Sequence, residues 1–243
     1  MWTFPVEANV DSVQPSGTGG TNAVTVKVVT NPVWANKTVH LSLSAGGSLG
    51  GHVSHSGTRP LGTLAATQGA TNAQGIFETT YTAPIFGGDV YISGTLDGSS
   101  ISRVLDMIVA VDGLDELGVS ADYSLVGGTT THPSNHWGTA TALTNLPLIA
   151  SDYLNQFPDT VVPDGVLRYN DMSLIWGGKF DLDHDWGNGD HVEHRIGINC
   201  DVYSANVPTS RWPALTRIFQ LRGSPNYGNE TASANHWHLK FDQ

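Results

Sequence analysis

The chain has little cysteine, little charge and few basic residues. Cys200 is the one cysteine among 243 residues, which excludes an internal disulfide framework and a zinc site built from several cysteines. Only 14% of the residues are charged, and 11 lysines and arginines stand against 22 acidic residues, a formal net charge of −11. Nucleic-acid backbones and anionic membrane surfaces require a concentrated basic face, so neither is expected as the main partner.

Long apolar runs are also absent. No run approaches the roughly 18 apolar residues that a membrane-spanning helix needs, so no membrane insertion is expected. The first residues, MWTFPVEANV, lack the basic and apolar regions of a signal peptide. We therefore expect either a cytosolic protein or one whose export signal lies outside this sequence.

The hydrophobic content of 39% is enough to build a core, and the 28 glycines indicate many turns and little helix. The composition shifts near residue 113, and this length suits one large domain or two ordinary ones. We predict a domain at 1–112 and a second at 113–243.

Short runs with strict period-two alternation, bounded by Gly, Pro, Asn and Ser, dominate the first 112 residues. This pattern is typical of half-buried strands and predicts an all-β sandwich. The predicted strands are 23–29, 38–44, 75–84, 89–96 and 102–111, with a further strand near 61–66. The stretch TNAQGIFETTYTAPIFGGDVYISG (71–94) resembles bacterial immunoglobulin-like modules of surface and secreted proteins. In this region His52 and His55 have a spacing that suits a metal, but we expect them to be solvated histidines of a loop.

The second half mixes helical and strand patterns and reads as an α+β domain. Apolar residues at helical spacing predict a helix within 138–157, either starting near Pro147 with Asn145 as its cap or kinked there. A second helix is predicted at 210–222, capped by Ser210 and ended by Gly223. Strands are predicted at 166–170, 196–203 and 236–241.

Four histidines and Asp201 gather in two segments of this half, GDHVEHRIGINCDV (189–202) and NHWHLKF (235–241). On a strand, His236 and His238 face the same side while Trp237 packs behind them. His194 and Asp201 can reach the same point through a turn at Gly197. Two imidazoles and one carboxylate suit Zn²⁺, and three protein ligands leave a position open for water, as in catalytic sites.

An acidic run, Asp181, Asp183, Asp185 and Asp190, faintly resembles a calcium loop, but no glutamate closes it at the required spacing. We expect a mostly solvated loop there. Cys200 precedes Asp201 on the same predicted strand, so alternation points it away from the site, and a buried structural thiol is expected.

The H-x6-D and H-x-H pair resembles the signature of the LAS zinc metallopeptidases, which include lysostaphin-type enzymes, D-Ala-D-Ala peptidases and the hedgehog signalling domain. Within that group the chain looks most like penicillin-insensitive murein endopeptidases. These carry a further histidine three residues before the first ligand, as His191 stands here, and an upstream SL-x-x-GG segment, matched by residues 173–178. The resemblance covers about 130–243.

The resemblance implies a hydrolase with one Zn²⁺ per chain, held by His194, Asp201 and His238, and an α+β LAS domain with a central antiparallel sheet. It implies catalytic roles for His236 and His191, peptidoglycan or peptide as substrate, and an extracytoplasmic location (periplasmic, cell-surface or secreted). Many relatives use a glutamate as general base three residues before the last ligand. Here that position is Asn235, so His236 becomes the candidate base.

Candidate substrate-binding residues are Arg168, Arg195 and Ser173, since an arginine fork suits the carboxylates of acidic stem peptides. The missing glutamate leaves an alternative open, a catalytically silent zinc-containing module that binds the cell wall or a protein. The first domain is expected to act as a spacer. The sequence predicts no particular oligomeric state.

Overall fold

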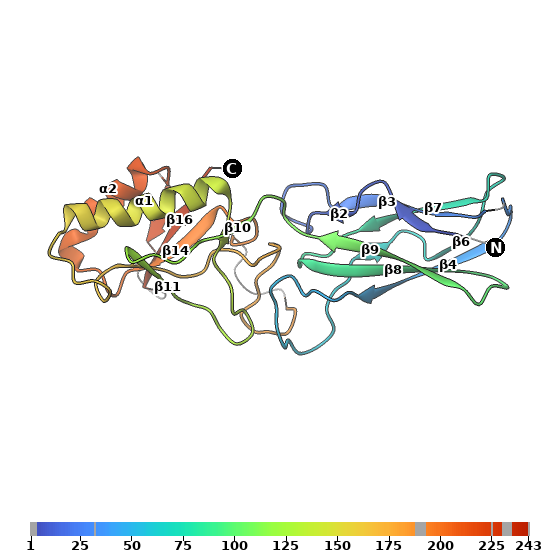
Figure 1. Ribbon diagram of the computed structural model, residues 1–243, viewed down its shortest axis with the longest axis horizontal. Coiled ribbons are helices and arrows are strands. Elements are labelled where there is room, and N and C mark those ends of the chain that lie inside the picture. Colours follow the sequence, from blue (N-terminus) through green and yellow to red (C-terminus); the bar gives the residue numbers. More distant parts are fainter. Residues whose placement is uncertain (1–3, 32, 188–192, 225, 230–234, 243) are drawn as a thin grey trace.

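A computed structural model describes residues 4–31, 33–187, 193–224, 226–229 and 235–242. Figure 1 shows an elongated molecule in which a part made of strands alone and a part that carries both helices lie end to end. The chain is mostly β, with several sheets and two α-helices, α1 (Ala140–Gln156) and α2 (Trp212–Leu221). None of the helices in the described ranges has both the length and the apolar character needed to cross a membrane.

The first half is a sandwich of two sheets. One sheet has the strand order β1-β3-β7-β5, which are Val6–Ala8, Ala23–Val29, Ile76–Thr82 and Thr63–Leu64. The other has the order β2-β9-β8-β4-β6, which are Ser12–Val13, Ser102–Val109, Gly88–Leu96, Thr38–Ala45 and Gln68–Ala70. All neighbours pair antiparallel except β2 and β9, which are parallel.

Alternating residues of these strands fill the space between the two sheets. In β3, Val24, Val26 and Val28 are buried while the residues between them are more exposed. The same alternation runs through β7 and β8. The period-two pattern therefore located the five long strands correctly. It did not reveal β1, β2 and β6, which have only two or three residues each.

The second half is built on a five-stranded sheet of order β11-β13-β14-β16-β15, which are Tyr123–Leu125, Leu167–Tyr169, Asn199–Tyr203, His236–Lys240 and Asn226–Asn229. The pairs from β13 to β15 are antiparallel, and β11 joins β13 in parallel. A short ladder of β10 (Asp115–Glu116) and β12 (Trp137–Gly138) lies beside it.

Both helices pack on one face of this sheet, so α1, α2 and the strands share one core. Helix α1 starts at Ala140, where the Thr139 side chain accepts a hydrogen bond from the Ala142 N–H, and it passes through Pro147. Of the two alternatives, a start near Pro147 with Asn145 as the cap is wrong, because the Asn145 amide donates to the Thr141 carbonyl inside the helix. The expected Ser210 cap of α2 is also wrong. A short 3-10 turn, η1 (Thr209–Arg211), leads into this helix without a side-chain cap.

Two separate hydrophobic cores support the two halves. One core contains residues between Phe4 and Val109, and the other contains residues between Leu117 and Phe241. Backbone hydrogen bonds cross the junction, including Lys179 N–H to the Ile85 carbonyl at 2.8 Å and Val111 N–H to the Trp176 carbonyl at 2.9 Å. Gly178 has a φ of +77° and approaches this junction closely, since a Cβ there would lie 2.8 Å from the Gly87 nitrogen.

Candidate metal centre

The pairing of β14 with β16 sets the centre of the site. In this antiparallel ladder Asp201 lies directly opposite His238, and Tyr203 lies opposite His236. The Asp201 Oδ1 atom is 2.9 Å from His238 Nδ1, and its Oδ2 atom is 3.4 Å from His236 Nε2. Residues distant in sequence are thus brought together by strand register.

Alternation along β16 separates the site from the core. Trp237 and Leu239 are fully buried on the helix side of the sheet, where the Trp237 ring meets Trp212 and Phe219 at centroid distances of 5.2 and 5.8 Å. His236 and His238 take the other face, with side chains 14% exposed. The expected arrangement of this strand is confirmed.

A turn after His194 brings its imidazole to Asp201 and His238. Gly197 adopts a φ of +72°, and a Cβ there would lie 2.4 Å from the Leu114 side chain, so this turn requires glycine. The His194 Nε2 atom lies 3.5 Å from Asp201 Oδ1. The rings of His194 and His238 meet edge to face at 5.0 Å.

The electrostatics favour an ionised carboxylate at the centre. Burial alone would raise the pKa of Asp201, but hydrogen bonds from His194 and His238 outweigh it and hold this pKa well below its usual range. Cys200, next along β14, faces the core and is buried. Burial raises the pKa of its thiol well above the ordinary value, and the expectation that this thiol is buried and faces away from the site is confirmed.

His194, Asp201 and His238 form a group suited to a metal ion. Their candidate ligand atoms all lie within 4.8 Å of one another, and His194 and Asp201 are buried. Two imidazole nitrogens and a carboxylate oxygen are the donors that zinc accepts, and three such ligands leave one tetrahedral position for water. The donor set therefore fits the zinc that the resemblance implies.

Two further polar residues reach His238, and sequence spacing did not reveal either of them. Glu193 places its Oε2 atom 2.8 Å from His238 Nε2, and the Asn199 side-chain nitrogen lies 2.6 Å from the same ring nitrogen. Glu193 directly precedes the ligand His194, whereas the sequence pattern indicated only the position three residues before the last ligand, which is Asn235. Its carboxylate is 61% exposed and so open to solvent.

The remaining predicted site residues lie in different places. Arg168 lines a cavity of about 410 Å³ together with Asn170, Tyr203 and two residues of the 126–127 turn. Tyr203 follows Asp201 by two positions on β14, and β13 buries Leu167 and Tyr169 on either side of Arg168. The cavity therefore opens on the face of the sheet that carries the histidines.

Ser173 and Arg195 lie toward the junction. Ser173 has no exposed surface, and its backbone pairs with Trp137 in an isolated bridge. Arg195 is half-buried and close to Gly17 of the first half, where an added Cβ would lie 2.9 Å from its guanidinium. Their roles in substrate binding stay predictions. His191 lies outside the described residues.

Three residues expected to be solvated are buried instead. His52 has 2% of its surface exposed, the His55 side chain 1% and Asp181 1%. The expectation of solvated loop histidines is therefore wrong. The expectation of a mostly solvated acidic run is wrong for Asp181, whereas Asp183 and Asp185 are exposed and Asp190 lies outside the described residues. The reason is tertiary contact, because the loop of the first half that carries both histidines packs against the loops of the second half.

Comparison with known proteins gives weak likenesses. No protein-family model and no curated protein matches the chain. Among solved structures it is similar to the D00-D0 domain of intimin, at 20% identity over 44% of this chain and 48% of that chain, with a TM-score of 0.33. It is also similar to a C-terminal fragment of intimin, solved in complex with the intimin-binding domain of the translocated intimin receptor. That likeness has 14% identity over 51% of this chain and 42% of that chain, with a TM-score of 0.33. The chain spans about half the length of these two solved chains.

Proposed function

We propose that the second half is a zinc-dependent hydrolase of amide bonds, acting on the cross-link peptides of peptidoglycan as murein endopeptidases do. The observation that carries this proposal is the group of His194, Asp201 and His238, whose donors converge at a point that solvent reaches. A closed structural site would use four protein ligands, whereas three suit catalysis.

Bound zinc would lower the pKa of its water and polarise the scissile carbonyl. The chain itself supplies a group that accepts and returns the proton. Glu193 Oε2 lies 2.8 Å from His238 Nε2, the ring nitrogen opposite the one that faces Asp201, so this carboxylate orients the His238 imidazole. His236, whose Nε2 atom is 3.4 Å from Asp201 Oδ2, is the imidazole that we place for proton delivery to the leaving amine.

The cavity beside the ligand group suits an acidic peptide. Arg168 presents a guanidinium there, with Asn170 and Tyr203 as further hydrogen-bonding groups. An arginine fork binds a carboxylate through two parallel hydrogen bonds. We assign Arg168 to hold a stem-peptide carboxylate while the adjacent amide lies at the ligand group.

In this proposal the first half is an immunoglobulin-like spacer that positions the hydrolase at a cell wall, and the protein works outside the cytoplasm. The described residues of the first half form a sandwich with a continuous hydrophobic core. The alternative function is a silent zinc-containing module that binds the wall or a protein. It retains the ligand group but has no turnover.

Incubation with purified, insoluble peptidoglycan separates these two functions. We expect wild-type protein to release soluble peptide fragments, detected by mass spectrometry, and release to stop when the metal is chelated. Protein that sediments with the wall and releases nothing, even with added zinc, would exclude the hydrolase and favour the binding module.

The roles of Glu193 and His236 are distinguished by substitution. We expect Glu193→Gln to weaken zinc binding by about 10- to 100-fold, the usual effect of losing a partner that orients a metal ligand, while kcat under saturating zinc changes little. His236→Ala is expected to lower kcat by about 10²- to 10⁴-fold, the usual contribution of a proton-transfer group, while the bound zinc is retained. Unchanged kcat in a folded, zinc-loaded His236→Ala would remove this imidazole from the mechanism.

A further inference from the structure

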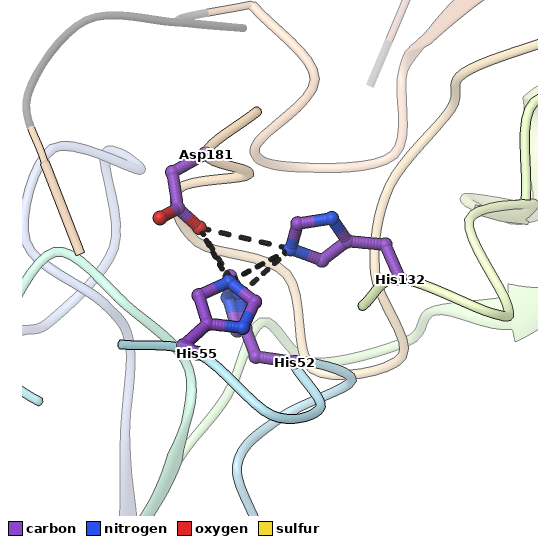
Figure 2. A group of neighbouring side chains, drawn as sticks. All are labelled: His52, His55, His132 and Asp181. Carbon is purple, nitrogen blue, oxygen red and sulfur yellow. Dashed lines mark hydrogen bonds and ion pairs between the residues drawn. The ribbon is translucent and has the colours of Figure 1, made fainter. Parts of the chain in front are cut away.

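A second group of histidines lies at the junction of the two halves, apart from the ligand group described above. His52 and His55 belong to the loop between β4 and β5 in the first half, and His132 belongs to the loop between β11 and β12 in the second. Asp181 comes from the long connection between β13 and β14. Figure 2 shows the three rings and the carboxylate directed at one another from separate segments.

One atom from each side chain faces the same central point: His52 Nδ1, His55 Nε2, His132 Nε2 and Asp181 Oδ1. The three nitrogens lie 3.0 to 3.1 Å from one another. The carboxylate oxygen lies 2.9, 3.3 and 3.6 Å from the nitrogens of His55, His52 and His132. Four atoms whose six separations are all similar occupy the corners of a tetrahedron.

The size of this tetrahedron suits a small metal ion. A metal about 2.0 Å from four tetrahedral ligands places those ligands about 3.3 Å apart, and 2.0–2.2 Å is the zinc distance to histidine nitrogen and carboxylate oxygen. Hydrogen bonding alone explains the arrangement poorly. A hydrogen bond needs one proton between two atoms, and each of these nitrogens meets three others of the group at once.

Neighbouring groups hold two of the four side chains in the orientation that a metal requires. His55 Nδ1 lies 3.1 Å from the Val53 carbonyl, which fixes the tautomer with a lone pair on Nε2. Asp181 Oδ2 accepts hydrogen bonds from the backbone N–H groups of Asp185 and Trp186 at 3.1 and 2.8 Å, which leaves Oδ1 directed at the group.

The four side chains are buried and have aromatic neighbours. The Trp186 ring lies 4.8 and 4.7 Å from the rings of His52 and His55, and Phe180 covers His132 at 4.6 Å. Burial, followed by the charges of His52 and His55, lowers the pKa of His132 to about 3. A neutral imidazole is the form that binds a metal.

We infer that His52, His55, His132 and Asp181 form a second, closed zinc site that fastens the first half of the chain to the second. All four tetrahedral positions are filled by protein, so this site holds no reactive water and is structural. Two ligands come from each half, so the bound ion ties the two halves into one body. It shares no ligand with the proposed catalytic centre and does not depend on it.

Metal content, measured by elemental analysis on purified full-length protein supplied with zinc, tests this inference. We expect about two zinc ions per chain in the wild type and about one in His55→Ala, with the same loss in Asp181→Asn. His194→Ala is expected to lose the other ion, so each site is scored independently of the other. His40→Ala, an exposed histidine that pairs with Asp97 outside both groups, is the matched control and should keep both ions.

Cobalt binding provides a test that does not require a ligand variant of the junction to fold. In metal-free His194→Ala, one equivalent of Co²⁺ should give the intense visible absorption of a tetrahedral ion. Zinc content in a folded His55→Ala equal to that of the wild type would overturn the inference. So would the absence of a tetrahedral cobalt spectrum in His194→Ala.

Discussion

Replacing His194 by alanine is expected to lower peptidoglycan hydrolysis by about a thousandfold or more. The His194 Nε2 atom is a candidate metal ligand and lies 3.5 Å from Asp201 Oδ1. Its loss leaves Asp201 and His238 alone to hold the ion. Metal polarisation contributes several kcal/mol to such reactions, and each 1.4 kcal/mol corresponds to about a factor of ten in rate. Asp201→Ala is expected to have the same effect, because this carboxylate contacts all three histidines.

Release of soluble fragments, followed by mass spectrometry under saturating zinc, measures this effect. His40→Ala serves as the matched control, since it removes an exposed imidazole far from the sheet of the second half. Circular dichroism establishes that each variant is folded. A folded His194→Ala that hydrolyses the wall at the wild-type rate would place the chemistry elsewhere in the chain.

The second large effect is expected on unfolding. In the His194→Ala background, where only the junction site binds, free zinc at about a thousand times its Kd should raise the free energy of unfolding by about 4 kcal/mol. The halves have separate cores, so we expect two unfolding transitions without zinc. With zinc, an ion that takes ligands from both halves should merge them into one transition at higher temperature.

Differential scanning calorimetry with and without zinc measures this coupling. The matched background is His194→Ala combined with His55→Ala, which should show the two-transition scan under both conditions. Scans of the single variant that do not change on addition of zinc would show that no ion links the halves.

The local patterns of the sequence predicted much of the fold. Alternation in Ala23–Val29 and helical spacing across Ala140–Gln156 are local signals, and the corresponding strand and helix are present. Helix starts were less predictable. Thr139 and not Asn145 caps α1, because Pro147 is tolerated within this helix and gave a misleading start signal.

The two metal-ligating groups differ in how far the sequence reveals them. Asp201 and His238 belong to two predicted strands, so alternation indicated which face each side chain takes, and the structure supplies the register that pairs them. His55 and Asp181 are 126 positions apart and lie in loops without periodicity, so only tertiary packing brings them together. Glu193 was missed for a similar reason, because its approach to His238 depends on the turn before β14.

Anomalous diffraction at the zinc edge, from crystals of the full chain grown with zinc, tests the central claim most directly. We predict one peak among His194, Asp201 and His238 with three protein ligands, and a second among His52, His55, His132 and Asp181 with four. Density for a non-protein ligand should complete the coordination of the first ion and not of the second. A map without a peak at His194 would contradict the hydrolase, and one without a peak at His55 would contradict the junction site.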